Sequence, residues 1–598
     1  MDSLPILRRA RRALVALATA VAAASPAAHA QESDDVLTNA ELSRSLERLR
    51  GERGLEVEVV EIGRSGGGRP ISMVRVAGRE REAARPALLV VAGARGPHTL
   101  GTGIALALVD SLLAGYARDS ALTALLDRAD ILVVPRLGPD AVEALRRRPR
   151  GDVVRNDTPR DDDRDGAIDE DGPDDLDGNG LLTMMRIADP AGDWVEDPDD
   201  PGLLRPADPA RGDRRAWKLM TEGRDEDGDG AWNEDPRGGT DPSANFPRGY
   251  GWFLETAGDY PLGAPEARAL AELVAERDAI AAVVVYGPQD NLASPWTVKP
   301  GSGRGASAGD GRGRRIREPL DAPLAEDAAW LAEVSRRYRE HTGRVESDTL
   351  GTESFGGDPV SWAYYHMGRW AFGSSAWSPP ALDAEAAALD SAAVGAEAEA
   401  DATTGPPRRT GRGTKEDPVA AERRLLRWLR ANRPDGFVEW TRVDHPDFPD
   451  RAVEVGGFAP GARWTPPVAE REEITRREVG FLIDLAGSLP RLALPRLEAE
   501  NLGDGAWRLT ARVANEGYLP TRTQLASQLG LPRAVRVTVE GEDVEVVGGR
   551  RSQAIDDLPG GGAEVELSWV VVGPPGRRVT VRAEAPAAGE ASAEVTLR

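Results

Sequence analysis

The sequence predicts an α/β protein with a mixed, largely parallel sheet flanked by helices, followed by a C-terminal all-β sandwich. Two observations predict the α/β part. Short continuous apolar runs are typical of buried parallel strands, and helical patterns alternate with these runs along the chain. A third observation predicts the sandwich, because short segments of alternating polarity sit between Gly and Pro turns after Pro490.

The first helix is predicted at a capping box formed by Thr38 and Glu41, which precedes leucines at helical spacing. The later elements alternate between strands and helices, as crossover connections require. Strands are expected at 57–62, 71–76, 87–92, 131–135 and 279–286, and helices at 101–114, 265–277 and 470–489. The sandwich strands are expected at 508–513, 535–539, 544–547 and 579–583.

The N-terminus is typical of an export signal. Four arginines at positions 8–12 precede an apolar run from Ala13 to Ala24, and Ala28-His29-Ala30 is a cleavage site of the A-x-A type. The run is too short to cross about 30 Å of hydrocarbon. We therefore expect a signal peptide, no transmembrane segment after its cleavage, and a periplasmic or secreted protein.

We expect the following domain organisation. The signal peptide spans 1–30, the α/β domain spans 31–490 and the β-sandwich spans 491–598. Within the α/β domain, residues 152–241 form an acidic insert and residues 381–416 form a low-complexity loop.

Composition excludes several classes of protein. Lys and Arg total 75 against 99 Asp and Glu, a net charge of −24, which argues against nucleic-acid binding. Cysteine is absent, so the chain has no disulfides, no thiolate zinc site and no cysteine nucleophile. Only 5 histidines are present, which restricts any zinc site built from imidazoles.

The acidic insert contains 28 acidic and 11 basic residues and repeats one spacing three times. Oxygen-bearing side chains at alternate positions, followed by a glycine, are what a calcium loop needs. The candidate calcium ligands are Asp161, Asp163, Asp165 and Asp169; Asp175, Asp177, Asn179 and Thr183; and Asp225, Asp227, Asp229 and Asn233.

None of the three loops is a complete EF-hand. The twelfth position, which holds a bidentate Glu in that motif, is Gly172, Arg186 or Pro236. Acids at the tenth and eleventh places of two loops could substitute. We expect structural calcium, because clustered negative charge without an ion repels itself. The alternative is a solvated acidic loop that binds no ion.

Several segments resemble the zinc carboxypeptidases, the funnelin-type metallocarboxypeptidases, in the order in which that family carries them. The resemblance covers nearly all of residues 35–598. The segments are 62–71, 131–140 (ILVVPRLGPD), 239–247 (GTDPSANFP) and 356–377, with 453–457 and 515–521 resembling bacterial members that have a calcium-loop insert and a C-terminal β domain.

The resemblance implies a zinc ion held by two His and one Glu, a second Glu as general base, and an Asn-Arg pair that binds a substrate carboxylate. At the matching positions this chain has Arg95 and His98 for the His-x-x-Glu motif, and Tyr286 for the other His. Arginine cannot ligate zinc. We therefore expect zinc to be absent.

The remaining family positions are also substituted. Ser243 and Ala244 replace the Asn-Arg pair, and Ser375 replaces the general base. We expect a pseudoenzyme with no catalytic residues, which binds a peptide or a cell-envelope ligand in the old cleft. Two alternatives stay open: a hydrolase with a relocated metal site, and a structural cell-envelope or interaction protein.

Overall fold

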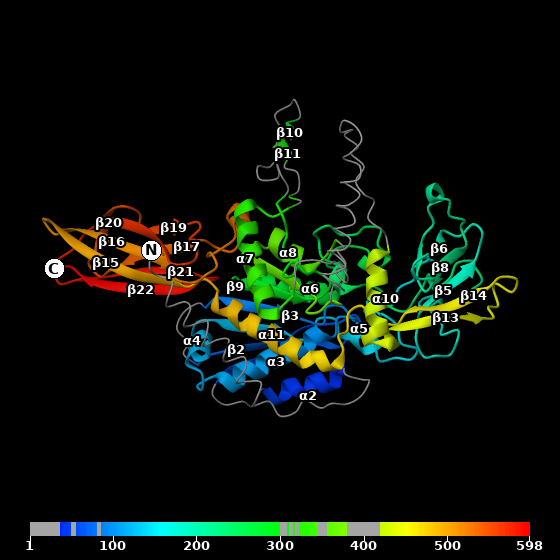
Figure 1. The fold of residues 1–598 in the computed structure, drawn as a ribbon. Helices are drawn as coiled ribbons and strands as arrows, with labels where there is room; N and C mark the ends of the chain where they lie inside the picture. The colour runs from blue at the N-terminus through cyan, green and yellow to red at the C-terminus, as the bar shows by residue number, and fades with distance from the viewer. Residues whose placement is uncertain are drawn as a thin grey trace, which may run out of the picture.

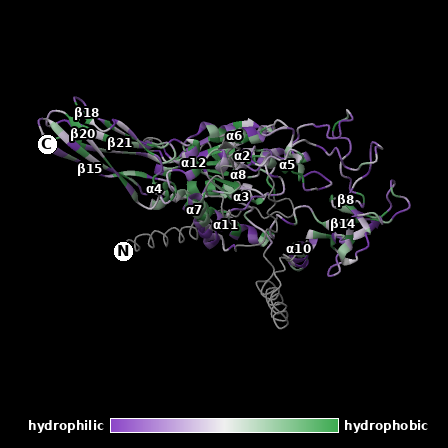
Figure 2. Ribbon diagram, turned by 90° about the horizontal axis from the view of Figure 1, so that it is seen from above, coloured by the Kyte–Doolittle hydropathy of each residue, from purple (hydrophilic) through white to green (hydrophobic). Residues whose placement is uncertain are grey.

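The computed structural model describes residues 36–49, 55–79, 85–298, 308–309, 315–316, 320, 322–344, 356–379 and 419–598. Three bodies follow one another in space (Figure 1): a β-sandwich at one end, an α/β domain in the middle, and a second sheet at the other end. The view from above shows the same arrangement, with hydrophilic residues frequent in the loops around the second sheet (Figure 2).

The central sheet has six strands in the order β1-β2-β4-β3-β9-β12. Strand β3 runs parallel to β4 and β9, and β9 runs parallel to β12, whereas β1 and β2 are antiparallel. The strands are β1 Glu56–Arg64, β2 Pro70–Ala77, β3 Ala87–Val91, β4 Asp130–Val134, β9 Ile280–Tyr286 and β12 Trp370–Ser374. The predicted mixed α/β fold is confirmed.

Helices cover both faces of this sheet because alternate side chains of each buried strand point to opposite faces. In β3, Leu88 and Val90 pack in one core and Leu89 and Val91 in the other. Helices on the first face are α2 Asn39–Leu49, α3 Leu100–Gly115, α4 Ser120–Arg128, α7 Ala325–Thr342 and α11 Val468–Gly487. Helices on the second face are α6 Pro265–Glu276 and α8 Pro359–Tyr365.

The predicted elements of this domain form close to their expected bounds. The capping box at α2 is made, since Thr38 N donates to Glu41 Oε2 at 2.8 Å and Glu41 N donates to Thr38 Oγ1 at 3.0 Å. Short helix α5 Pro139–Ala144 follows β4, and α10 Ala420–Asn432 precedes β13 and β14. The low-complexity loop predicted at 381–416 lies outside the described residues.

The second sheet is a feature that the sequence did not predict. Its order is β13-β14-β5-β8-β6-β7, and its small core includes Met185, Ile187, Val453 and Val455. The acidic insert supplies β5 Met184–Ala188, β6 Trp194–Glu196, β7 Leu204–Pro206 and β8 Trp217–Thr221, and a later hairpin supplies β13 Phe437–Val443 and β14 Val453–Phe458. The insert is therefore a folded unit completed by a distant segment.

The C-terminal domain is built from two four-stranded antiparallel sheets, β15-β16-β20-β18 and β19-β17-β21-β22, which share one core. The predicted all-β domain is confirmed. Its strands are β15 Leu492–Gly503, β16 Ala506–Asn515, β17 Val535–Glu540, β18 Glu545–Gly548, β19 Ser552–Ile555, β20 Ala563–Val572, β21 Arg578–Ala585 and β22 Gly589–Thr596, and its helix is α12 Gln524–Leu529.

A buried carboxylate joins the sandwich to the α/β domain. Asp327 of α7 accepts hydrogen bonds from the backbone N–H groups of Gln524 at 2.6 Å and Leu525 at 3.0 Å, and from the hydroxyl of Tyr364 at 2.8 Å. Nearby, Trp370 Nε1 donates to the carbonyl of Pro520 at 3.3 Å. These bonds satisfy the first N–H groups of α12, which a helix start leaves without partners.

The remaining elements are short. They are β10 Ala308–Gly309, β11 Arg315–Ile316, and the 3₁₀ turns η2 Pro209–Arg211, η3 Pro242–Ala244, η4 Glu255–Ala257 and η5 Pro434–Gly436. No single helix within the described ranges combines the length and apolar character needed to cross a bilayer. Helices α3 and α4 taken together are long and apolar enough, but their axes are bent by 111° at the break between them.

Candidate functional site

The residues that the resemblance aligns with the family's zinc ligands and general base lie at the carboxyl ends of the parallel strands of the central sheet. Arg95 and His98 follow β3, Tyr286 is the last residue of β9, and Ser375 follows β12. The chain connects β3 to β4 on one side, while β9 lies on the other side. Such a switch in strand order is where open α/β sheets bind ligands.

Arg95, which the resemblance aligns with the first zinc ligand, is paired with a buried acid. Its Nε lies 3.3 Å from Asp241 Oδ2, and the Asp241 carboxylate is almost fully buried. Asp241 also accepts a hydrogen bond from Ser243 Oγ at 2.6 Å. Ser243 and Ala244, at the substrate-clamp positions, are both buried in η3 at 1% exposure. This segment therefore offers no guanidinium or amide to a substrate carboxylate.

His98 is a neutral, buried ring. Its side chain packs against Trp464 with ring centroids 4.8 Å apart, and its exposure is 5%. Within the described residues its Nε2 has no hydrogen-bond partner. Burial, and secondarily the charge of Arg95, lowers the pKa of His98 to about 3. A neutral imidazole can ligate a metal, but this one faces an indole.

Tyr286, which the resemblance aligns with the other histidine ligand, is hydrogen-bonded to an acid of α11. Its hydroxyl donates to Glu478 Oε2 at 2.9 Å, and Tyr338 of α7 donates to Glu478 Oε1 at 2.6 Å. All three side chains are fully buried. Burial raises the pKa of Glu478 to about 7, although the two tyrosine hydrogen bonds and Arg344 oppose this rise.

Ser375, at the general-base position, belongs to the same polar network. Its Oγ donates to Asp290 Oδ2 at 2.7 Å, and Arg344 Nη1 donates to the same oxygen at 2.6 Å. Arg344 also lies 3.4 Å from the hydroxyl of Tyr338, which is 2.8 Å from Ser374 Oγ. A continuous set of hydrogen bonds therefore links Tyr286 to Ser375 through the interior.

These residues do not fit a zinc ion. A guanidinium stands at one of the aligned positions, a hydroxyl that donates to a carboxylate stands at another, and His98 belongs to no group of three potential ligands among the described residues. In the part of the chain that the structure describes, every group of three or more potential ligands consists of Asp and Glu from the acidic insert, and none contains His.

Three further histidines lie in the described ranges: His341, His366 and His445. We predict surface positions for His341 and His445, and the prediction is wrong for His445, which is 4% exposed and has Nε2 2.8 Å from the carbonyl of Gly223. His341 is half-buried near Asp484, and His366, for which a structural role is expected, is exposed at the end of α8.

The three acidic loops share one backbone conformation. In each, the first acid accepts hydrogen bonds from two backbone N–H groups within the loop, including that of the glycine at the sixth position. The third and fifth side chains each accept from the N–H two residues later. The side-chain oxygens of positions one, three and five are thereby turned inward.

Acids from outside the predicted sets complete several clusters. The groups whose ligand atoms all lie within 4.8 Å of one another are Asp161, Asp163 and Asp165; Asp163, Glu170 and Asp235; Asp163, Asp227, Asp229 and Glu234; Asp171, Asp225 and Asp227; and Asp175, Asp177 and Glu222. Five carboxylates in these groups (Glu170, Asp171, Glu222, Glu234 and Asp235) are absent from the predicted ligand list. The acids at tenth and eleventh positions were visible in the sequence; Glu222 carries no local signal.

Four predicted calcium ligands are used for other contacts. Asp169 Oδ1 accepts from the N–H of Gly238 at 3.0 Å, and Thr183 Oγ1 donates to Glu222 Oε1 at 2.8 Å. Asn179 and Asn233 donate through Nδ2 to Asp177 and to the carbonyl of Thr221, respectively. These contacts position the loops, and the carboxylates listed above are the residues that the fold brings together.

Burial and neighbouring carboxylates disfavour the ionised form of several clustered acids. Burial and neighbouring carboxylates raise the pKa of Glu170 and Glu234 to about 7 and raise that of Asp171. The third loop also contacts the β13–β14 hairpin through hydrogen bonds. Asp447 Oδ2 accepts from Asp225 N at 3.1 Å and from Trp232 Nε1 at 3.0 Å.

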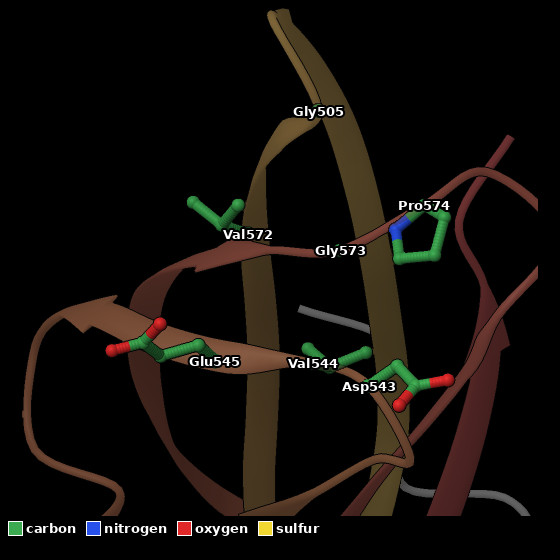
Figure 3. A pocket seen from close by; sticks show the side chains of 7 residues that line it. All are labelled: Gly505, Asp543, Val544, Glu545, Val572, Gly573 and Pro574. Carbon is green, nitrogen blue, oxygen red and sulfur yellow. The ribbon is translucent and has the colours of Figure 1, made fainter.

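A shallow groove of about 580 Å³ lies in the C-terminal domain, far from the sheet edge described above. Figure 3 shows its lining, in which Val544, Val572 and Pro574 provide the apolar wall and Asp543 and Glu545 the polar rim. Arg577 pairs with Asp543 beside it. No hydroxyl or imidazole side chain is among its lining residues.

Comparison with known proteins identifies two matching segments of the chain. Residues 42–174 match the family model described as zinc carboxypeptidase. The resemblance to zinc carboxypeptidases is thereby confirmed. The matched segment includes β1 to β4, the Arg95–His98 turn and the first acidic loop. Residues 491–596 match a domain of unknown function.

Individual relatives are distant. Carboxypeptidase D of Anas platyrhynchos is 40% identical over 67 residues, which are 11% of this chain and 5% of that protein. The structure of carboxypeptidase A from Helicoverpa armigera is 14% identical, with 61% of this chain and 70% of that chain covered at a TM-score of 0.33. Bovine thrombin-activatable fibrinolysis inhibitor is 15% identical, with coverages of 57% and 85% at a TM-score of 0.32. Both TM-scores are below 0.5, so these likenesses carry no conclusion about function.

Proposed function

We propose that this chain is a non-catalytic relative of the zinc carboxypeptidases, in which the metal centre has become part of the hydrophobic and polar core. One observation carries the proposal: Tyr286, at a family zinc-ligand position, donates its hydroxyl hydrogen to the buried Glu478. A phenol that keeps its proton and donates it to a buried acid is a poor zinc ligand, and the guanidinium of Arg95 has no lone pair to offer a metal.

The rest of the family chemistry is also missing from its expected places. Ser375 hydrogen-bonds to Asp290 and has no carboxylate to activate water. Ser243 and Ala244 are buried and cannot clamp a free C-terminus. We infer that any ligand of the old cleft differs from a free peptide C-terminus, and that an exported protein of this kind binds a peptide or an envelope component there.

We further propose that calcium holds the acidic insert in its folded form. The support is the pattern of clustered carboxylates, together with Asp171 Oδ1, which is buried and without a hydrogen-bond partner in the described residues. An unpaired buried carboxylate is costly, and a hard cation with several oxygen ligands removes that cost. The role is structural because these acids lie outside the sheet edge.

Metal analysis and a peptidase assay on the purified mature chain test the two parts together. We expect bound calcium, less than stoichiometric zinc after incubation with zinc, and no release of C-terminal residues from a panel of peptides. A zinc carboxypeptidase assayed in parallel verifies the substrates. Stoichiometric zinc with turnover that is lost on chelation would overturn the non-catalytic proposal and favour a relocated metal site.

The His98→Phe variant distinguishes the source of any activity that is found. If a relocated site used His98, the substitution would abolish zinc binding and turnover. If activity came from a contaminant, it would persist at the same level in this variant. The expected result for the non-catalytic protein is no activity in either chain, with both chains retaining the same calcium content.

A further inference from the structure

The first acidic loop (161–172) and the third (225–236) lie against each other. We propose that they form a paired calcium site in which each ion is completed by the eleventh-position acid of the other loop. This inference rests on the proposal that the insert binds calcium, and it specifies which residues hold which ion. The acids concerned are Asp171 of the first loop and Asp235 of the third.

The exchange follows from where the eleventh residues point. Asp171 lies with Asp225 and Asp227 of the third loop in a group whose ligand atoms are all within 4.8 Å of one another. Asp235 forms the corresponding group with Asp163 and Glu170 of the first loop. Neither eleventh residue appears in a group with the first, third or fifth residue of its own loop.

The backbone supports this exchange. Asp171 and Asp235 form an antiparallel bridge, so the two loops run past each other at these residues. Asp235 Oδ2 accepts from the ninth-position N–H of the first loop, Asp169, at 3.0 Å, and Asp171 Oδ2 accepts from the ninth-position N–H of the third loop, Asn233, at 3.3 Å. Both ninth residues have φ of 58°. The two eleventh residues therefore make matching backbone contacts with the opposite loop.

An unsatisfied oxygen points to a ligand. Asp171 is 1% exposed, and its Oδ1 has no hydrogen-bond partner among the described residues, although Oδ2 does. That oxygen belongs to the side chain that meets Asp225 and Asp227. Glu170 Oε2 and both carboxylate oxygens of Glu234 are also buried without a hydrogen-bond donor, and these carboxyls face those of Asp235 and Asp171, respectively. Buried polar atoms normally have partners, and we infer that a cation is the partner of these oxygens.

The donor set selects calcium. Dividing the clustered acids by loop, with the eleventh residues exchanged, assigns Asp161, Asp163, Asp165, Glu170 and Asp235 to one ion, and Asp225, Asp227, Asp229, Glu234 and Asp171 to the other. Each set is all oxygen, as Ca²⁺ requires, and lacks the nitrogen or sulfur that zinc prefers. Asp163 also groups with Asp227, Asp229 and Glu234, so the two sites are adjacent and the first ion relieves repulsion at the second.

Terbium luminescence can separate the two sites in the full mature chain. Trp232 is the eighth residue of the third loop and packs on Phe448 with ring centroids 5.0 Å apart. An indole within the loop transfers excitation to Tb³⁺ bound there. The part of the emission that is lost in the Trp232→Phe variant therefore reports occupancy of the third loop.

Exchange predicts a crossed result. Asp171→Asn, although in the first loop, should weaken terbium affinity at the third loop at least tenfold, as the direct ligand variant Asp229→Asn does. Asp235→Asn lies in the third loop, yet it should weaken terbium affinity at the third loop severalfold less than Asp171→Asn does. Asp193→Asn, an exposed acid in the same insert, is the matched control and should leave the emission unchanged.

The outcomes distinguish the two proposals. No binding of Tb³⁺ or Ca²⁺ by the unmodified chain would overturn calcium binding itself. Binding in which Asp235→Asn, and not Asp171→Asn, empties the third loop would overturn only the exchange. Folding is checked on the ion-free proteins: Asp171→Asn should melt no lower than the unmodified chain, because it removes an uncompensated buried charge. A lower melting temperature would make Asp171 a structural group and would contradict the assignment.

Discussion

Replacing Glu478 with Gln should change how the stability of the protein depends on pH. Glu478 is fully buried between two tyrosine hydroxyls, and its pKa rises from the ordinary 4.5 to about 7. One pKa unit corresponds to about 1.4 kcal/mol, so the ionised form costs the folded state about 3 kcal/mol relative to the protonated form.

The direction of the effect follows from proton binding. The folded state holds the Glu478 proton at pH values where the unfolded state has released it. The contribution of this group to stability is therefore fully present below about pH 4.5 and is lost as the pH rises through about 7. Glutamine cannot ionise. Hence the unfolding free energy of Glu478→Gln, relative to the unmodified chain, should rise by about 3 kcal/mol between pH 4.5 and pH 8.

Urea unfolding across this pH range, with calcium held constant and in excess, measures the difference. All other titrating groups are common to both proteins and cancel. Tyr286→Phe is the matched control: it removes one hydrogen bond to the carboxylate but keeps the ionisable group, so the pH dependence should persist. A stability difference between Glu478→Gln and the unmodified chain that is constant with pH would refute the reasoning.

Three further outcomes are expected. Removing calcium with a chelator should lower the melting temperature, since an ion present at about 100 times its Kd contributes about 2.7 kcal/mol; an unchanged calorimetric transition would count against bound calcium. Asp327→Ala should lower the unfolding free energy in urea by about 2–3 kcal/mol because it leaves N–H groups of α12 buried without an acceptor, whereas a loss below about 0.5 kcal/mol would show that this contact matters little. His98→Phe should change the unfolding free energy by less than about 1 kcal/mol, since a neutral ring on Trp464 is exchanged for an apolar one; a large loss would reveal a polar role for His98.

Much of the fold could be predicted because its signals are local. The run Ala87–Val91 is apolar throughout, as a strand covered on both faces must be, and Thr38 with Glu41 defines a helix start within four residues. The substituted family positions could likewise be located from short motifs around β3, β9 and β12. These features need no knowledge of what lies opposite in space.

The features that could not be predicted depend on distant pairing. Strand β5 joins β14, and Met185 pairs with Val455, a residue 270 positions later. Tyr286 and Glu478 are 192 residues apart, and Glu222 reaches the N–H of Leu176 from 46 positions away. No local spacing indicates such partners. The sequence therefore predicted the acidic loops of the insert but not the sheet that the insert forms with β13 and β14.

The sharing of one sheet by β5 and β14 has a consequence for proteolysis. A single cut in the insert between β5 and β8 would break the covalent chain without separating the products, because β5 stays paired with β14 through several backbone positions, and β14 belongs to the C-terminal fragment. The nicked protein should elute as one particle from a sizing column and run as two bands on a denaturing gel.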